Sequence, residues 1–341
     1  QSPIPNPQSP LILFEFYISL FISEIYYIKY LKKIYIYIAY MSQPQKSKVY
    51  FTKTITPEKL IEMYNKLDIK LTGNIGVKVH SGEKGNKNFL RPEFLKPIVD
   101  YLDGTIVETN TSCPEDFGAR TTLERHTKLL EEHGWTKTFK KVVILDGEPP
   151  DEELDIPNGL ILKKNYIGGK TKDYDSFLVV AHFKGHGWGG FGGALKQLSI
   201  GFGSRVSKTI QHSAGKNADP AKVFDHFCSD KDFKECMADC ASSVVNKYKG
   251  KLCYLNVMKN ISCDCDCDGN ARPPCMKDIG ILASTDPVAI DQACLDLIYK
   301  SDEPGKKELI ERIEGKLGPH IIECAVKLGV GSSEYELINV D

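Results

Sequence analysis

The feature that most constrains the fold is an unbroken apolar run near the middle of the chain. Residues 176–183 include Phe177, Leu178, Val179 and Val180 in succession, with no polar position among these four. A strand of this kind is buried on both faces, which is typical of a parallel sheet covered by helices on both sides. The run therefore favours an α/β fold.

Segments with strand and helix patterns alternate around this run. Strands are expected at 41–53, 73–80, 105–108, 141–145, 176–183, 251–257 and 279–283, and helices at 57–67, 92–102, 118–133, 231–248, 287–300, 305–316 and 320–328. Strands separated by helices indicate βαβ units on a mainly parallel sheet. We therefore predict one three-layer α/β domain over residues 41–341, with helices flanking the sheet.

The first forty residues differ from the rest. The sequence begins with Gln1, contains no Met before Met41, and consists over 11–40 almost entirely of Ile, Tyr, Phe, Leu, Lys and Ser. Charged residues interrupt its apolar runs short of the roughly 18–20 residues that a membrane span needs. The positive charges come late, whereas a signal peptide carries them first. We expect residues 1–40 to be translated upstream sequence outside the native protein; a membrane segment is the alternative.

Charge and cysteine content limit the function classes. The formal net charge is −1, so nothing global attracts nucleic acid or a membrane, and neither is expected as a partner. The chain has 11 cysteines, an odd number with irregular spacing and no plausible secretory leader. This pattern argues against a disulfide framework and favours reduced thiols in the cytoplasm, some of them metal ligands.

A glycine-rich segment follows the central strand. It reads His182-Phe-Lys-Gly-His-Gly-Trp-Gly-Gly-Phe-Gly-Gly193, and a helix is expected from Ala194. Its glycines match G-x-G-x-x-G between a strand and a helix, where a free helix N-terminus can bind an anion. No acidic residue follows about 20 positions later, which argues against dinucleotide binding.

Positive side chains favour a small anionic ligand for this segment. They are Lys184, His186, Lys196, Arg205 and Lys208. The alternative is a tightly packed turn whose lysines are merely solvated. His182 and His186 lie four residues apart with two glycines near them, so the ligand spacing of a helix does not apply. A metal shared between them also stays open.

The strongest chemical signal is the segment Cys263-Asp-Cys-Asp-Cys-Asp268, followed by Cys275. In an extended chain its cysteines would share one face and its aspartates the other, whereas a tight turn at Asp268-Gly269 could fold both sets inward. Closely packed thiolates repel one another unless a cation lies among them. Cysteine and carboxylate ligands suit zinc or iron. We predict a metal here, although a polar loop with incidental cysteines is the alternative.

The remaining cysteines carry weaker signals. Cys236 and Cys240 accompany an apolar helical stripe and are expected in the core. Cys253, Cys294 and Cys324 lie in apolar patterns and are expected to be buried. Cys113 precedes a proline at a strand end, where it could be accessible.

Several stretches, in order, resemble one family. They are Glu108-Thr-Asn-Thr111, His182-Phe-Lys-Gly-His186, Phe191-Gly-Gly-Ala-Leu-Lys196, Asp264-Cys-Asp-Cys267, Asp278-Ile-Gly-Ile-Leu-Ala-Ser284, Asp286-Pro-Val-Ala-Ile-Asp-Gln-Ala293 and the tail 331–338. From about Val49 onward the chain resembles the uncharacterised iron–sulfur-centre proteins called domain of unknown function 362.

Many members of that family carry a ferredoxin-like insert with cysteine runs for [4Fe–4S] clusters. The corresponding place here, 214–246, holds only Cys228, Cys236 and Cys240, so the resemblance is to a subgroup without the insert. The resemblance implies that the aspartate–cysteine loop, His182, Lys184, His186 and His212 are site residues, and it implies no particular substrate.

We therefore predict one site, beyond the carboxyl ends of the strands, that joins 263–268 to 182–193. The expected metal ligands are Cys263, Asp264, Cys265, Asp266 and Cys267, and the metal is iron, an iron–sulfur cluster or zinc. The expected catalytic residues are His182, Lys184 and His186, the last as proton carrier. The expected ligand-binding residues are Gly187, Gly189, Gly192, Lys196, Arg205 and His212, with Arg205 and Lys184 holding an anion.

Three functions are compatible with this prediction. The first is a metal-dependent enzyme or redox protein acting on a small anionic substrate. The second is a non-catalytic protein whose metal pins a loop. The third is a module that binds phosphate or another anion. The sequence leaves the oligomeric state open.

Overall fold

The computed structural model describes residues 21, 26–27, 29–33 and 46–341. The chain divides into two units, Gln1–Lys46 and Ser47–Asp341. The predicted leader, residues 1–40, lies largely outside the described residues, so that prediction stays a prediction. Among the helices that are described, none has both the length and the apolarity that crossing a bilayer requires.

The second unit is built on an eight-stranded sheet with the order β12-β1-β11-β10-β7-β2-β3-β4. Its strands are β1 (Ser47–Thr52), β2 (Ile75–Lys78), β3 (Thr105–Glu108), β4 (Val142–Ile144), β7 (Ser176–His182), β10 (Leu252–Met258), β11 (Gly280–Ser284) and β12 (Tyr335–Asn339). Every strand except β11 runs in the same direction. The apolar run forms β7, which lies inside the sheet and is buried along its whole length. The predicted mainly parallel sheet is thus confirmed.

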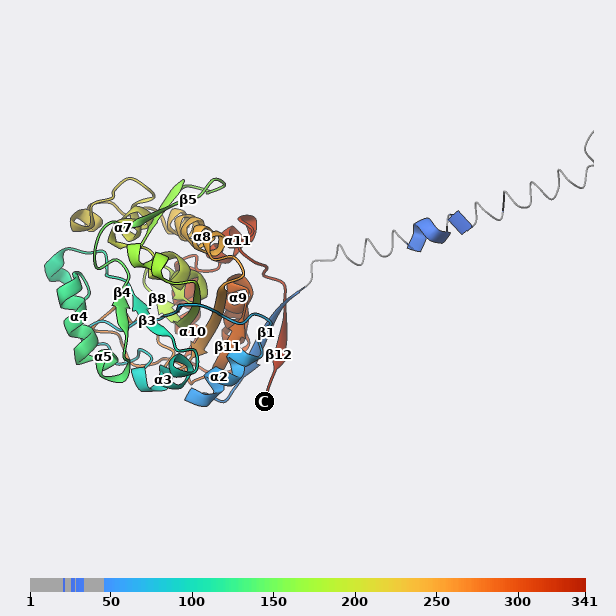
Figure 1. The fold of residues 1–341 in the computed structure, drawn as a ribbon, viewed down its shortest axis with the longest axis horizontal. Coiled ribbons are helices and arrows are strands. Elements are labelled where there is room, and N and C mark those ends of the chain that lie inside the picture. Colours follow the sequence, from blue (N-terminus) through green and yellow to red (C-terminus); the bar gives the residue numbers. More distant parts are fainter. Residues whose placement is uncertain (1–20, 22–25, 28, 34–45) are drawn as a thin grey trace, which may run out of the picture. The chain divides into compact units, whose positions relative to one another are not determined.

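Helices cover both faces of this sheet, which gives the predicted three layers (Figure 1). One face packs against α2 (Pro57–Asn65), α3 (Pro92–Tyr101) and α5 (Trp135–Thr138) in one apolar core. The other packs against α6 (Ala194–Lys196), α8 (Asp230–Lys247), α9 (Pro287–Lys300), α10 (Lys306–Gly315) and α11 (His320–Lys327) in a second core. Helices α4 (Leu123–Glu132) and α7 (Arg205–Ser213) complete the set used below.

Local sequence explains where several of these helices begin. The Thr56 hydroxyl accepts the backbone N–H of Lys59, and Pro57 follows at the first helical position of α2. Asp286 caps α9 in the same way, ahead of Pro287. Thr122 caps α4, so this helix begins at Leu123 and not at the expected 118.

The glycine-rich segment folds differently from the prediction. Residues after β7 form a hairpin of β8 (Lys184–His186) and β9 (Gly190–Gly192), with 187–189 as its turn. A second hairpin of β5 (Glu152–Asp155) and β6 (Lys164–Ile167) lies outside the main sheet. A β-strand of three residues is too short to be recognised in the sequence, because the alternation of apolar and polar residues needs more positions to be visible.

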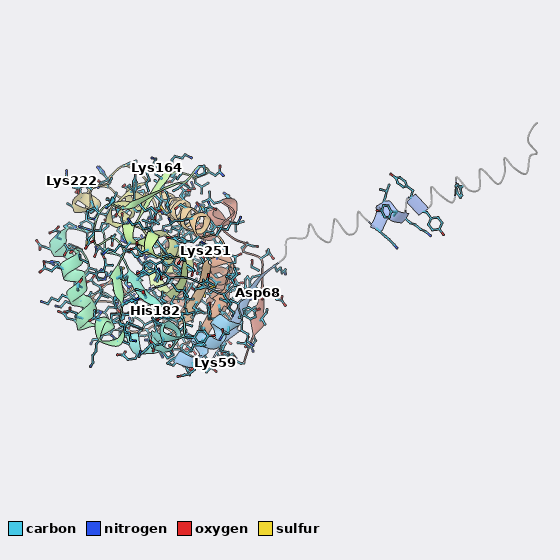
Figure 2. All side chains as sticks on the ribbon, in the orientation of Figure 1. Lys59, Asp68, Lys164, His182, Lys222 and Lys251 are labelled. Atoms are coloured by element: carbon cyan, nitrogen blue, oxygen red, sulfur yellow. The ribbon has the colours of Figure 1, made fainter. Side chains whose placement is uncertain are left out.

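Four parallel strands end at the same edge of the sheet. β10 pairs with β7 so that Val257 lies beside His182, and β7 pairs in turn with β2, which pairs with β3. The loops that follow these strands therefore meet at one place. Figure 2 shows His182 within the body of the unit, whereas Lys59, Lys164 and Lys222 lie at its periphery. The predicted site position, beyond the carboxyl ends of the strands, is where these loops gather.

Candidate functional site

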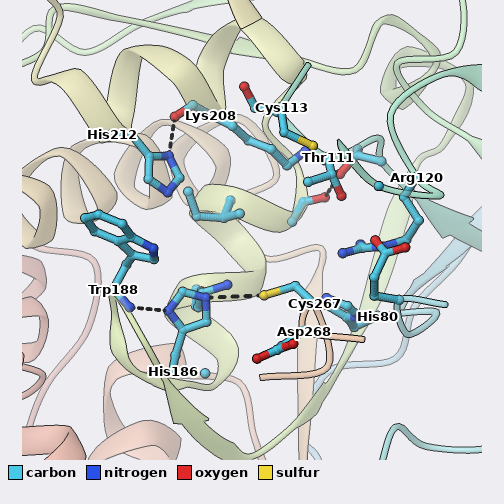
Figure 3. Close-up of a pocket in the computed structure, with 18 of the residues that line it drawn as sticks. His80, Thr111, Cys113, Arg120, His186, Trp188, Lys208, His212, Cys267 and Asp268 are labelled. Atoms are coloured by element: carbon cyan, nitrogen blue, oxygen red, sulfur yellow. Dashed lines mark hydrogen bonds and ion pairs between the residues drawn. The ribbon is translucent and has the colours of Figure 1, made fainter. Parts of the chain in front are cut away.

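A cavity of about 580 Å³ opens where these loops gather. Figure 3 shows His186 and Cys267 as neighbours in its wall, with Trp188 and His212 on one side and His80 and Arg120 on the other. Its walls come from the ends of β2, β3 and β7, the β8–β9 hairpin, α7 and the cysteine loop. The cavity thus unites the two segments that the sequence singled out.

The cysteine loop is a turn and not an extended strand. The backbone N–H of Asp268 donates to the carbonyl of Cys265 at 3.0 Å, which closes the turn. Cys265 is buried, and Cys267 is exposed to the cavity. The sulfurs of both residues and one ring nitrogen of His186 all lie within 4.8 Å of one another. This group is small enough to share a single ion.

Asp266 anchors the loop to the sheet. Its carboxylate lies 2.9 Å from Nδ1 of His182 and accepts the Lys184 ammonium at 2.8 Å, and all three side chains are buried. Burial alone would raise the pKa of Asp266, but His182 and Lys184 hold it well below its usual range. The carboxylate is therefore fully engaged inside the protein.

The same anchor occupies His182 and Lys184. Nε2 of His182 lies 2.5 Å from the carbonyl oxygen of Lys259, so both ring nitrogens have partners. Lys184 is 4% exposed and neutralised by Asp266. Both side chains line the cavity, but their contacts are those of a structural brace.

Backbone contacts fix the loop from two further sides. The Asn86 side chain donates to the carbonyls of Cys265 and Asp268 at 3.2 and 2.8 Å. The Gly185 N–H donates to the Ser262 carbonyl at 2.8 Å. A Cβ on Gly185 would lie 2.4 Å from the Cys263 carbonyl oxygen, so this close approach requires glycine.

Two of the expected metal ligands point elsewhere. Asp264 pairs with Arg272 at 2.9 Å and with Arg312 at 3.3 Å. The sulfur of Cys263 lies 3.0 Å from that of Cys275. Together with Asp266, they are not brought into the group of Cys265, Cys267 and His186, because the turn breaks the alternation that would have aligned them.

His186 carries its proton on the nitrogen that faces the sulfurs. Its Nδ1 accepts the backbone N–H groups of Trp188 and Gly189 at 3.0 and 2.8 Å. Burial, helped by Lys196, lowers the pKa of His186 to about 4, so the ring is neutral at pH 7. A neutral ring that accepts at Nδ1 must hold its proton at Nε2. That nitrogen lies 3.7 Å from the Cys267 sulfur.

His212 has the opposite arrangement. Its Nδ1 donates to the carbonyl of Lys208 at 2.6 Å, and burial lowers the pKa of His212 to about 4. The lone pair of Nε2 is therefore free on the cavity side, where Figure 3 shows the ring. A proton acceptor in this cavity is thus His212 more readily than His186.

The thiols of Cys265 and Cys267 differ in pKa, and Cys265 is the more acidic of the two. Burial alone would raise the pKa of Cys265, but the hydrogen bond from the Cys267 thiol and the neighbouring His186 hold it well below its usual range. The positive charge of Lys196 acts in the same direction. The site is therefore built to hold a thiolate.

Most cations that line the cavity are already paired. Lys78 contacts Glu108 at 2.8 Å, and Arg120 contacts Glu83 at 3.1 Å. Lys208 donates to the Thr109 hydroxyl at 2.8 Å. Over the described residues, the ammonium of Lys196 has no hydrogen bond and no ion pair, and the residue lines the cavity. Lys196 thus supplies a positive charge without an ion-pair partner, while the Asp268 carboxylate, which lines the cavity as well, has no ion pair in the described part of the chain.

Most of the glycines expected to bind a ligand, and Arg205, do not line the cavity. Gly192 lines the cavity, whereas Gly187, Gly189 and Arg205 do not. Two backbone N–H groups at the start of α6 donate to the Asp291 carboxylate at 2.7 and 2.9 Å. This helix N-terminus is occupied by a side chain, so it is not the anion site that the sequence predicted. Arg205 donates to the carbonyl of Cys113 and supports that loop.

The other cysteines are placed as expected. Cys236, Cys240, Cys253, Cys294 and Cys324 are buried in apolar surroundings. Cys113 is buried as well, but it lines the cavity. Glu235, His320 and Cys324 form a second group between α8 and α11 that could hold an ion. Ion pairs of His320 with Glu235 and Glu323 account for that group as a contact between helices.

Sequence reasoning missed two parts of the site. One is the buried network of Lys78, Glu108 and Arg120, whose members come from separate segments. The other is an aromatic wall whose members are Phe117, Trp188, Phe224, Phe227 and Phe233. The Glu108 motif was visible as part of the family resemblance, whereas nothing in the sequence connects aromatic residues from three distant segments.

The family described as domain of unknown function 362 matches residues 75–296. The chain belongs to this family. The match covers every segment that contributes the thiols and the four histidines that line the cavity, His80, His182, His186 and His212. No curated protein matches the chain significantly.

Two solved structures show only distant similarity. A protein from Thermotoga maritima has 12% identity and a TM-score of 0.37, with 80% of this chain and 57% of that chain covered. The lactate racemase apoprotein from Thermoanaerobacterium thermosaccharolyticum has 13% identity and a TM-score of 0.35, with 61% and 50% covered. The chain thus spans 57% of the first structure and half of the second, and scores this low carry no functional argument.

Proposed function

We propose that this protein binds a thiophilic metal ion through Cys265 and Cys267, at the base of a cavity that accepts a small anionic substrate. The observation that supports this most is the grouping of both sulfurs with His186 at the wall of a cavity of about 580 Å³, which Cys267 and His186 line. Two thiolates in contact favour a cation between them. Iron and zinc both accept such ligands.

The side chains fit such an ion in part. Both sulfurs are suitable donors, while the proton on Nε2 makes His186 a hydrogen-bond donor to a thiolate and not a third ligand. Two protein ligands leave coordination positions open, as in catalytic and not in structural sites. When bound, the ion would supply Lewis-acid or redox chemistry beside the substrate.

The chain's own side chains have separate tasks in this proposal. Lys196 attracts the anion, His212 accepts a proton at Nε2, and His186 stabilises the thiolates. Asp266, His182 and Lys184 hold the loop in place. The reaction itself is left open.

Metal analysis of anaerobically purified protein tests the proposal. We expect about one iron or zinc per chain in the wild type and none in Cys265→Ser/Cys267→Ser. The matched control is Cys236→Ser/Cys240→Ser, a pair in the core that should retain the metal, and Cys324→Ser should retain it as well. Metal-free wild type of full stability, or metal kept by the first double variant, would contradict the proposal.

A second function, nucleophilic catalysis by a thiolate, is favoured by two groups. The Nε2 proton of His186 and the ammonium of Lys196 both stabilise a thiolate without a metal. In this case the cysteine pair would act as a nucleophile. Chelator-treated protein should then react with iodoacetamide, forming a carbon–sulfur bond and releasing iodide. Alkylation at Cys265 or Cys267 that is no faster than at Cys113 would exclude this alternative.

A further inference from the structure

The mouth of the cavity carries four large aromatic side chains that are partly exposed. The exposed fractions are 71% for Phe117, 41% for Trp188, 46% for Phe224 and 41% for Phe227. They come from three segments: the 3₁₀ turn Glu115–Phe117, the β8–β9 turn, and the 3₁₀ helix Pro220–Asp225 with the residues after it. All four line the cavity.

These rings form one continuous surface. Trp188 and Phe227 stack with centroids 4.3 Å apart and an interplanar angle of 23°. Phe117 lies 4.8 Å from Phe224, which lies 6.1 Å from Phe227. Exposed apolar area costs about 25 cal/mol per Å² relative to burial, and contiguous patches of it mark ligand sites. A surface of flat rings matches a planar apolar ligand.

The charge in the same cavity specifies the other end of the ligand. The cations Lys78, Arg120 and Lys184 face carboxylates at 2.8 to 3.1 Å. Lys196 has no such partner among the residues that the structure describes. A Cβ on Gly189 would lie 3.7 Å from Cδ of Lys196 and 3.4 Å from Nδ1 of His186, so Lys196 lies at the hairpin turn beside the histidine that faces the thiols. Lys208 also lacks an ion pair, but its ammonium donates to the Thr109 hydroxyl and the Gly203 carbonyl. The Asp268 carboxylate lines the cavity and, within the described part of the chain, has no ion pair either. Two cations and one carboxylate without ion pairs match a head group with a single negative charge.

We propose that the ligand of this cavity is a small carboxylate with a planar aromatic body. The body lies on Trp188 and Phe227, and the carboxylate contacts Lys196 next to the cysteine pair. The volume of about 580 Å³ is within the range of small-molecule sites and accommodates two fused rings. This inference deepens the proposed function and rests on its site, because it names the class of substrate.

Calorimetric titration with defined probes tests the inference. The probes are 2-naphthoate, uncharged 2-naphthamide, 2-naphthyl phosphate and acetate. We expect 2-naphthoate to bind at least tenfold more tightly than each of the others. Equal affinity for acetate would contradict the aromatic part, and equal or tighter binding of the amide or the phosphate would contradict the single charge.

Variants with matched controls assign the contacts. Lys196→Met should remove the preference for naphthoate over naphthamide and leave naphthamide binding unchanged. Phe227→Ala should weaken both about tenfold. Lys128→Met and Tyr101→Ala, which change exposed side chains outside the cavity, should alter neither. Variants of Lys196 and Phe227 that bind naphthoate like the wild type would overturn the inference.

Metal content measured on the same samples separates this inference from the proposed function. Stoichiometric metal without naphthoate binding contradicts the substrate class alone. Naphthoate binding with the predicted variant pattern and without metal supports the substrate class and contradicts the metal.

Discussion

His186 and His212 face the same cavity, but their protons lie on different ring nitrogens. The backbone groups that contact Nδ1 of each ring cause this difference. Two N–H donors at Nδ1 of His186 place its proton toward the sulfurs, whereas a carbonyl at Nδ1 of His212 leaves that ring's lone pair toward the cavity. A sequence shows only two histidines near glycines. Their separate tasks depend on a hairpin turn and on a helix, so sequence reasoning assigned proton transfer to His186.

Substitution of His186 tests this assignment. His186→Gln keeps a side-chain N–H near the position of Nε2, and His186→Leu does not. We expect the glutamine variant to keep stoichiometric metal, and the leucine variant to lose about fivefold in affinity, the value of one hydrogen bond of about 1 kcal/mol. Competition with a chromophoric chelator measures both. If His186 is a metal ligand, both variants lose the ion.

Asp266 carries a second prediction at the scale of single residues. Asp266→Asn leaves Lys184 buried without its counter-charge, so we expect the free energy of unfolding to fall by about 3–5 kcal/mol. Asp264→Asn removes a pair with the half-exposed Arg272 and should cost about 1 kcal/mol or less. Urea unfolding compares the two. Equal effects of both variants would contradict the role of Asp266 as the anchor of the loop.

The pKa of Asp266 also predicts how the free energy of unfolding changes with pH. The pKa of Asp266 is lower in the folded protein than the usual unfolded value of about 3.9, so the unfolded state binds a proton first as pH falls. The contribution of the Asp266 carboxylate to stability is complete above the unfolded pKa of about 3.9 and is lost as the pH falls below it. The stability difference between wild type and Asp266→Asn should therefore shrink below about pH 4 and be constant from pH 5 to 7. A difference that grows on acidification would contradict the ion pair.

At the scale of elements, regular periodicity made most of the fold predictable. The buried run predicted β7, and apolar stripes predicted α8 and α9 within a residue of their ends. The β8–β9 hairpin was missed because glycines carry no alternating pattern. The i, i+2 spacing of the cysteine loop predicted a shared face, but the turn at Cys265–Asp268 separates its residues. Partners distant in sequence, such as Lys184 and Arg272, then determine where each aspartate points.

Helix α7 gives the cavity a pH-dependent charge. Burial lowers the pKa of Lys208 to about 8, and burial raises the pKa of its neighbour Asp146 to about 6. As pH falls, Lys208 gains a proton near pH 8 and Asp146 becomes neutral near pH 6, so both steps make the cavity more positive. Glu108, Lys78 and Arg120 also face Lys208.

Anion affinity should follow that charge. We expect 2-naphthoate to bind more tightly in two steps as pH falls from 9 to 5, and Lys208→Met to remove the step near pH 8. Calorimetric titration at each pH measures the affinity. Weaker binding at lower pH would contradict the charge assignment.

At the scale of the whole molecule, the sheet consists of residues from Ser47 onward and both main apolar cores consist of residues from Val49 onward. We therefore expect a chain that begins at Met41 to fold with the same melting temperature as the full sequence. Circular dichroism during heating measures this. A loss of several degrees would show that the preceding residues contribute to the fold, and intact-mass measurement of native protein would show directly whether residues 11–40 are present.

The family match over 75–296 includes the thiols, the hairpin and α7, so the site is a property of the whole α/β unit and not of one loop. The sequence predicted a site that joins the cysteine loop to residues 182–193, with five metal ligands from the loop. The structure instead places two thiols from that loop against a histidine from β8 and a wall of side chains from other elements.

X-ray absorption spectroscopy of the metal-loaded protein identifies the atoms that are bound to the ion. We predict two sulfur ligands, assigned to Cys265 and Cys267 by their loss in the double serine variant, with the other positions filled by light atoms that lack the outer-shell scattering of imidazole. A bound ion without sulfur ligands, or a spectrum unchanged in Cys265→Ser/Cys267→Ser, would contradict this prediction.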